Sequence, residues 1–210
     1  MTTAAQADPV TNFRSWLDAN GYATNTSTNL WYGTNGVNGP LLTVNGDSWI
    51  TPPEQFQTPQ ISAFVDPGDQ NGGAGPATFP GSFFHPGPST PVVLAYAPQV
   101  AIPLSVVEVH AELILNGLSG NGVTIDVYTT IASNTVNHGS YDLTGSTDLV
   151  ALFPVGNLTL NPGDTMHVAI GNRGSYFFDH VNVDVTLTVP EPASAVLLML
   201  PLGLSVMRRR

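Results

Sequence analysis

The strongest constraint on the fold of this 210-residue chain is a strict alternation of side chains between residues 106 and 115. In a β-strand, successive side chains point to opposite faces of the sheet, so residues two apart share a face. The pattern therefore predicts a half-buried antiparallel strand with one apolar and one polar face. The apolar face carries Val107, Val109, Ala111, Leu113 and Leu115, and the other carries Val106, Glu108, His110, Glu112 and Ile114.

Further strand patterns follow at short intervals and are separated by turn residues. Residues 123–128 alternate in the same way, and the remaining strand-like runs cover 140–143, 149–153, 157–160, 165–171 and 181–187. The connections are rich in Asn-Gly pairs and include the β-turn signature at 161–164 (NPGD). The only helical pattern is at 12–17, and residues 66–90 are loop by composition. This organisation predicts one all-β domain, either a sandwich or a barrel.

The charge balance excludes several classes of function. Charged residues make up only 10% of the chain, Lys is absent, and the net charge is −10. Between residues 8 and 190, fourteen acids stand against Arg14 and Arg173, which gives a net charge of −12. Such a domain repels phosphates, so nucleic acid is excluded as a partner. The absence of Cys excludes disulfides, thiolate catalysis and metal sites built on thiolates.

The C-terminus has three parts in a fixed order. A Pro-Glu-Pro motif precedes an apolar run over residues 195–207, and three arginines end the chain. A helix over 193–207 would rise about 22 Å, which makes a marginal span of the ~30 Å hydrocarbon core of a bilayer. The arginines would hold that end in the cytoplasm. A buried C-terminal helix capped by arginines is the alternative.

This tail resembles the PEP-CTERM sorting signal of Gram-negative bacteria over about 22 residues. The residues that match are Pro190, Glu191, Pro192, Arg208, Arg209 and Arg210, with the apolar run between them. The resemblance implies export across the inner membrane and transient anchoring by the tail. It also implies processing by an exosortase, a membrane-embedded cysteine protease, and delivery to the cell surface or extracellular matrix.

Substrates of this kind carry an N-terminal export signal, and here the sequence departs from the pattern. Residues 1–7 (MTTAAQA) have neither a basic nor an apolar region, although Ala5-Gln6-Ala7 fits the cleavage site of a signal peptide. We interpret residues 1–7 as a signal-peptide remnant, with an ordinary N-terminal segment as the alternative. The predicted organisation is therefore a remnant at 1–7, a β-sandwich domain at 8–188 and a sorting signal with a transmembrane helix at 189–210.

Short motifs within 12–188 also resemble jelly-roll domains of bacterial envelope proteins. The matching stretches are 29–33 (NLWYG), 85–87 (HPG), 163–165 (GDT) and 171–179 (GNRGSYFFD), which lead into the final strand. The first stretch lacks the Ser that usually separates its Trp and Tyr. The resemblance implies a jelly-roll-like antiparallel sandwich of the carbohydrate-binding type, and it brings no catalytic residues.

Two sets of residues are candidates for a metal site. Glu108, His110 and Glu112 share one face at a spacing of about 6.6–6.8 Å, and Asp126 would lie near them if the strands pair in order. Asp184 would join the same face, and Asp66, Asp69, Asp164 and Asp179 are loop acids that could hold a structural Ca²⁺. The alternative is a solvent-exposed row of polar side chains with no metal.

A second set points to ligand binding, because sugar-binding sandwiches stack aromatic rings against pyranose units. The candidates are Trp31, Tyr32, Trp49, His85, Tyr176 and Asp179. Core packing is the alternative for each aromatic ring, and a backbone-capping role is the alternative for His85. The serines Ser82 and Ser175 have no nucleophile elbow around them.

Together these features predict a non-catalytic exported protein associated with exopolysaccharide or the biofilm matrix, with carbohydrate binding and without an intrinsic cofactor. One alternative is a structural surface protein that self-associates or is glycosylated, for example in the stretch 24–29 (TNTSTN). The other alternative is a secreted polysaccharide hydrolase that uses His85 and nearby acids.

Overall fold

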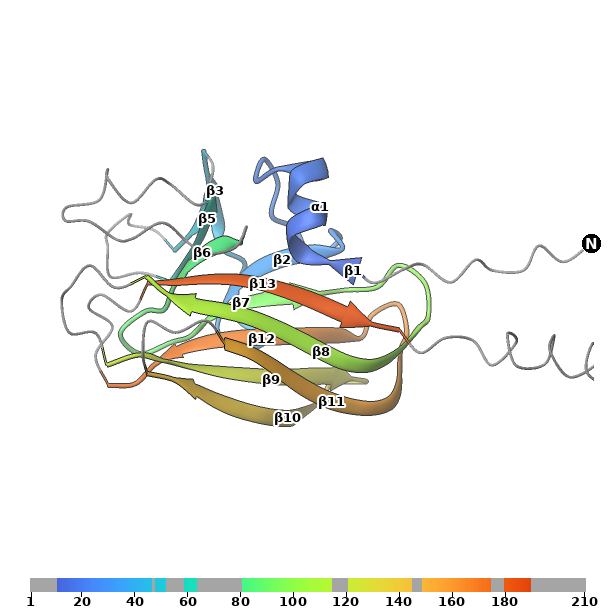
Figure 1. The fold of residues 1–210 in the computed structure, drawn as a ribbon. Coiled ribbons are helices and arrows are strands. Elements are labelled where there is room, and N and C mark those ends of the chain that lie inside the picture. The colour runs from blue at the N-terminus through green and yellow to red at the C-terminus, as the bar shows by residue number, and fades with distance from the viewer. Residues whose placement is uncertain are drawn as a thin grey trace, which may run out of the picture.

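A computed structural model describes residues 11–46, 48–51, 59–63, 81–114, 121–144, 149–174 and 180–189. They form two antiparallel sheets stacked as layers, with one helix at the upper side of the view in Figure 1. Sheet A has the order β11-β8-β13-β6-β5-β4-β3, with β1 also paired to β13, and sheet B has the order β10-β9-β12-β7-β2. The elements are β1 (Thr11–Asn12), α1 (Phe13–Asn20), β2 (Trp31–Asn35), β3 (Thr43–Asn45), β4 (Ser48–Ile50), β5 (Gln60–Ala63), β6 (Ser82–His85), β7 (Val92–Tyr96), β8 (Ile102–Leu113), β9 (Val123–Ile131), β10 (Asn134–Leu143), β11 (Leu149–Leu160), β12 (Thr165–Asn172) and β13 (Val181–Thr188).

The strands β6 to β13 are interleaved between the two sheets in the order of a jelly roll, with the consecutive strands β9 and β10 paired in sheet B. Four of them give β11-β8-β13-β6 in sheet A, and the other four give β10-β9-β12-β7 in sheet B. The strands β1 to β5 extend these two four-stranded sheets. The predicted all-β, jelly-roll-like antiparallel sandwich is confirmed. The predicted C-terminal helix and the sorting motif lie outside the described residues.

The two-faced pattern of β8 is confirmed by burial. Val107, Val109 and Ala111 are fully buried, whereas Glu108 and His110 between them are partly exposed. The buried residues of β8 meet the apolar faces of β9, β12 and β13 in one core. Period-two patterning therefore fixes which side chains fill the space between the sheets.

The N-terminal helix α1 covers the end of this core with Phe13 and Leu17. Asn12 caps the helix by accepting a hydrogen bond from the Ser15 backbone N–H at 2.8 Å, as its extended backbone allows. The helix ends at Gly21, which has a φ of 68° and donates its N–H to the Leu17 carbonyl. The helical pattern at 12–17 is thus confirmed, and the helix continues to Asn20.

The two ends of the domain meet in one place. β1 pairs antiparallel with β13, so that Thr11 lies opposite Leu187. The chain therefore enters and leaves the sandwich at the same end (Figure 1). No helix within the described ranges is long and apolar enough to cross a membrane.

Candidate functional site

The outer face of sheet B presents an uncharged row that crosses all five strands. The pairing register places Tyr32, Ala95, His167, Tyr128 and Asn137 side by side, from β2 through β7, β12 and β9 to β10. At the β2 end, Tyr32 and Ala95 are buried. At the β10 end, Tyr128 is partly exposed and Asn137 is exposed. The accessible part of this row therefore lies on β9 and β10.

A hydrogen-bond network joins this row to the turn after β2. The Nε2 atom of His167 lies 2.7 Å from the Thr165 hydroxyl and 3.3 Å from the Thr130 hydroxyl. The Asn38 amide in turn donates to the hydroxyls of Thr130 and Thr135, at 3.3 and 3.1 Å. The turn that carries Asn38 is thus tied to the β9–β10 hairpin.

His167 lies beneath this network and is only 1% exposed. Burial lowers its pKa to about 4, because the imidazolium form would lose its hydration. At neutral pH the ring is therefore uncharged and bonded through Nε2. Its Nδ1 atom has no hydrogen-bond partner among the described residues. His167 is part of the floor of the face and is not a surface ligand.

Tyr128 is the aromatic residue at the accessible end of the row. Burial and the nearby Asp126 carboxylate raise the pKa of its hydroxyl, and a hydrogen bond with the Asn137 side chain acts in the opposite direction. The hydroxyl is thus protonated at neutral pH. Ring, amide, carboxylate and hydroxyls therefore meet on one partly exposed surface, which we call the β9–β10 face: Asp126, Tyr128, Thr130, Thr135 and Asn137.

The sequence pattern does not single out Tyr128 as a site residue, because a position in an alternating strand identifies only the face that the side chain occupies. The available signal was that Tyr128 stands at a polar-face position of an alternating strand, where a large aromatic ring is unusual. The strand on which its partner Asn137 lies, β10, was expected only from residue 140 onward.

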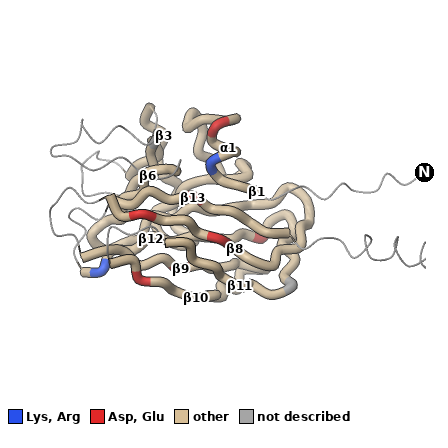
Figure 2. Tube along the Cα trace, viewed as in Figure 1, with Lys and Arg blue, Asp and Glu red and all other residues tan. Residues whose placement is uncertain are grey.

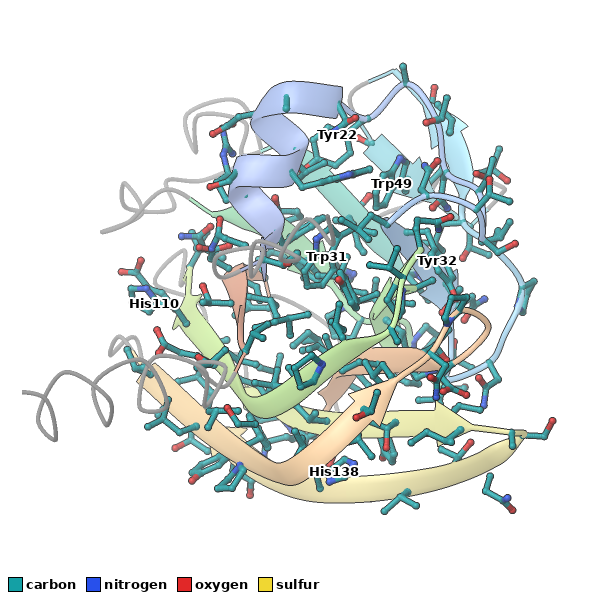
Figure 3. All side chains as sticks on the ribbon, turned by 90° about the vertical axis from the view of Figure 1, so that its right-hand side faces the viewer. Tyr22, Trp31, Tyr32, Trp49, His110 and His138 are labelled. Atoms are coloured by element: carbon teal, nitrogen blue, oxygen red, sulfur yellow. The ribbon has the colours of Figure 1, made fainter. Side chains whose placement is uncertain are left out.

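Two of the aromatic residues predicted to bind a ligand lie in the core instead. Trp31 and Trp49 are fully buried and pack around Phe13, with ring centroids 5.4 and 6.5 Å from it. Trp49 also donates its indole N–H to the Tyr22 carbonyl at 3.0 Å. The prediction that these two rings contact a ligand is wrong, since α1 covers them (Figure 3).

The other predicted ligands do not form a site with them. Tyr32 keeps only 7% of its surface exposed on the outer face of sheet B. His85 is 1% exposed on the other sheet, where its ring stacks edge-on to His180 at 4.7 Å. A general base must reach the substrate, and a side chain this buried does not. Tyr176 and Asp179 lie outside the described residues.

The polar row of sheet A is present, although Glu112 is only 8% exposed, and Asp126 is not part of it. Glu108, His110 and Glu112 share the outer face of β8, with His110 at the edge of the molecule in Figure 3. β8 pairs with β11 and β13, whereas β9 belongs to sheet B. The expectation that Asp126 lies near the row is therefore wrong, because the chain crosses from sheet A to sheet B between β8 and β9. Within the described ranges, no group of three or more His, Asp or Glu side chains is placed to hold a metal ion.

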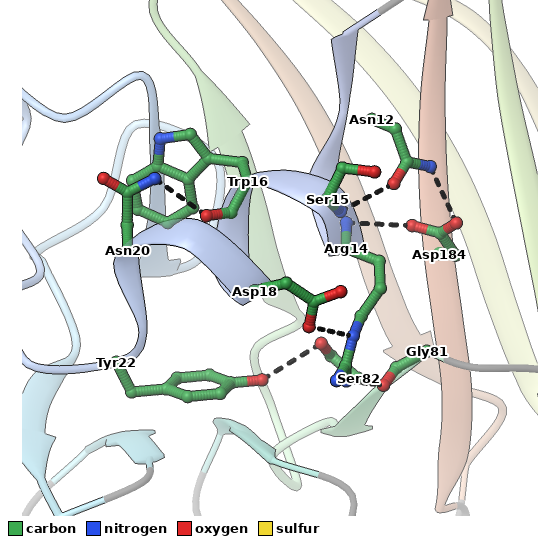
Figure 4. A network of polar contacts seen from close by, with 10 residues as sticks. All are labelled: Asn12, Arg14, Ser15, Trp16, Asp18, Asn20, Tyr22, Gly81, Ser82 and Asp184. Atoms are coloured by element: carbon green, nitrogen blue, oxygen red, sulfur yellow. Dashed lines mark hydrogen bonds and ion pairs between the residues drawn. The ribbon is translucent and has the colours of Figure 1, made fainter.

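Asp184 lies opposite His110, as expected, but its carboxylate has other partners. It accepts a hydrogen bond from the Asn12 amide at 2.7 Å and another from the Arg14 backbone N–H at 3.2 Å (Figure 4). Arg14 also donates to the Gly81 carbonyl at 2.9 Å and pairs with Asp18 at 2.8 Å. Asp184 therefore fastens α1 to the last strand.

Of the four loop acids, the structure describes only Asp164, whose carboxylate has a structural role. Asp164 accepts hydrogen bonds from the backbone N–H groups of Asn161 and Ala132, which lowers its pKa. It closes the turn predicted at 161–164. Asp66, Asp69 and Asp179 lie outside the described residues.

Only part of the stretch 24–29 is accessible to glycosylation. Asn25 is 8% exposed, and its amide donates to the carbonyls of Gly33 and Leu42 at 2.9 and 2.6 Å. It also accepts the Gly33 N–H at 2.8 Å. Asn25 is thus a structural residue, whereas Thr26 and Thr28 are exposed.

No protein-family model and no curated protein matches this sequence. Among solved structures, the chain is similar to a family 29 carbohydrate-binding module from Piromyces equi, with 9% identity over 79% of this chain and 96% of the module and a TM-score of 0.39. It is similar to the family 32 module of NanJ from C. perfringens in complex with galactose, with 10% identity over 75% and 90% of the two chains and a TM-score of 0.32. It is also similar to part of xylanase 10C from Cellvibrio japonicus in complex with xylopentaose. That match has 13% identity and a TM-score of 0.40, and covers 80% of this chain and 28% of the xylanase. The identities are too low to carry any residue of these proteins over to this chain.

Proposed function

We propose that this chain is a non-catalytic exported protein that binds polysaccharide at the cell surface through the β9–β10 face. The observation that carries the proposal is the position of Tyr128, a partly exposed residue that lies near Asp126 and whose hydroxyl is hydrogen-bonded to the Asn137 side chain. An aromatic surface with fixed polar neighbours suits a pyranose ring, which is apolar on its faces and polar at its edge.

The hydrogen bonds between residues of the face support the same proposal. Thr130 is held by Asn38 and Thr135, with Thr130 and Thr135 hydroxyls 3.0 Å apart, so the hydroxyls around Tyr128 are fixed before any ligand arrives. Groups ordered in advance lose less conformational entropy on binding than free side chains do. The proposal makes this face a pre-organised surface for sugar hydroxyls.

The test is binding of the full chain to a panel of neutral and amino-sugar oligosaccharides by calorimetry. Tyr128→Ala should reduce the affinity for the bound oligosaccharide by about fivefold or more, if a sugar stacked on the ring contributes about 1–3 kcal/mol as a stacked nucleobase does. Tyr141→Ala is the matched control, because Tyr141 is 43% exposed and packs edge-on against Phe153 at 5.1 Å, away from this face. Equal losses in both variants, or no binding by the unchanged chain, would refute the proposal.

We propose in addition that residues 189–210 act as the sorting signal suggested by Pro190, Glu191, Pro192 and the terminal arginines. The support from the fold is that β13 ends beside β1, so that a tail following Thr188 leaves from that end of the sandwich. The remaining support for this proposal is the sequence motif itself. Mass spectrometry of the protein recovered from the surface of its host should show a C-terminus near residues 190–194. An extracellular form that retains Arg210 would contradict this part of the proposal.

A second candidate function is self-association within the surface layer. The edge strands β10 and β11 lie along one side of the sandwich (Figure 1), and four exposed large apolar residues lie on them. They are Val136, Tyr141, Val150 and Leu152. Uncovered sheet edges can pair with another chain. Sedimentation at rising concentration tests this candidate, since Val136→Lys should then reduce the association.

A further inference from the structure

The cations of the described domain are already paired. The two described cations are Arg14 and Arg173, the two blue segments in Figure 2. The full chain contains no Lys. Arg14 forms an ion pair with Asp18 at 2.8 Å, and Arg173 forms one with Asp142 at 3.0 Å. An acidic polysaccharide therefore finds no unpaired Arg or Lys among the residues that the structure describes.

Asp126 differs from the two paired arginines, because it is a charged residue without an ion pair among the described residues. It is partly exposed on β9, where the pairing register places it between Ala169 of β12 and Ser140 of β10, two residues with small side chains. Among the described residues, no cation lies within ion-pair distance of its carboxylate. The Asp126 charge acts on Tyr128, two residues further along the same face. A negative charge and an aromatic ring therefore stand together without a cation.

We propose that the polysaccharide bound by the β9–β10 face carries free amino groups. This inference rests on the proposed function and adds the chemical class of the sugar. A protonated amine can pair with the Asp126 carboxylate and lie against the Tyr128 ring, which also attracts cations. Asn137 and the Thr130 and Thr135 hydroxyls would bind the sugar hydroxyls. The net charge of −10 favours the same class over uronic or sulfated polymers.

The experiment compares three probes against the full chain by calorimetry at a mildly acidic pH, at which the amines of the probe are protonated. The probes are a glucosamine hexamer, an N-acetylglucosamine hexamer and a galacturonic acid hexamer. The glucosamine hexamer should bind best and should weaken as salt is added, because salt screens exposed charges. The galacturonic acid hexamer should not bind.

Two substitutions separate a specific site from general attraction. Asp126→Asn should lower the affinity for the glucosamine hexamer by about threefold to fivefold, as expected for one exposed charge pair. Glu108→Gln changes the net charge equally but lies on the outer face of sheet A, so it should leave the affinity nearly unchanged. Melting curves of both variants confirm that the fold is retained.

The other possible outcomes would overturn the amino-group inference, the proposed function or both. Equal losses in Asp126→Asn and Glu108→Gln would mean that only net charge matters, and the inference fails. Equal, Tyr128-dependent binding of the glucosamine and N-acetylglucosamine hexamers would overturn the amino-group inference and leave the proposed function standing. Binding that does not respond to Tyr128→Ala would overturn both.

Discussion

On the outer face of sheet A, Asp184 accepts hydrogen bonds from Asn12 and Arg14, whereas on the outer face of sheet B Asp126 has no ion pair among the described residues. Both carboxylates stand at polar positions of alternating strands. Asp184 lies where α1 and β1 join the last strand, so its carboxylate oxygens accept hydrogen bonds that hold the fold together. Asp126 lies on a strand that no helix covers in the described structure. The same sequence pattern thus gives a structural carboxylate on one face and an available one on the other.

The largest effect is expected from the side of β8 that faces the core. Val109→Asp places a charge among fully buried apolar residues, and it should lower the free energy of unfolding by more than about 4 kcal/mol or prevent folding. His110→Asp, one residue further on the outer face, should cost clearly less, although it places a like charge opposite Asp184. Urea unfolding of both variants measures the difference. Similar, severe losses in both would show that the outer face of sheet A is also part of the core.

A smaller, pH-dependent effect is expected from His167 on the sheet B side. The pKa of His167 is about 4 in the folded protein, against about 6.5 in an unfolded chain. Below about pH 6.5 the unfolded chain therefore takes up a proton that the folded protein does not. Stability should fall as the pH is lowered, by up to about 3 kcal/mol near pH 4.

His167→Gln keeps an acceptor near Thr165 but has no proton to gain, so its stability should depend less on pH. His180, whose pKa burial also lowers to about 4, remains in both proteins, and the difference between the two curves therefore isolates His167. Thermal unfolding between neutral and acidic pH provides the measurement. Parallel curves would show that His167 is accessible to protons in the folded state.

The smallest change in stability is expected when the two carboxylates are removed one at a time. Asp184→Ala removes the acceptor of the Asn12 and Arg14 hydrogen bonds and should cost about 2 kcal/mol, since bonds to charged groups contribute about 1.5–3 kcal/mol. Asp126→Ala should change stability by less than about 0.5 kcal/mol. Equal costs would mean that Asp126 also holds the structure together, and the distinction between the faces would disappear.

Local features of the sequence predicted local structure well. The alternation over residues 106–114 identified the buried face of β8, and NPGD at 161–164 identified the turn that Asp164 closes. The pattern at 12–17 identified α1, whose cap is Asn12. These features depend on backbone periodicity and on contacts between residues a few positions apart, which the sequence displays directly.

What the sequence did not determine is which strands become neighbours. β8 and β9 follow each other in the chain but join different sheets, which separates Asp126 from His110. Asn12 and Asp184 are 172 residues apart and yet share a hydrogen bond, and α1 covers Trp31 and Trp49. Such pairings depend on the closure of two sheets around one core, a balance of long-range contacts that leaves no local pattern. The sequence by itself determined the faces of the strands, and only the tertiary structure decided that the accessible face carries Tyr128 and Asp126.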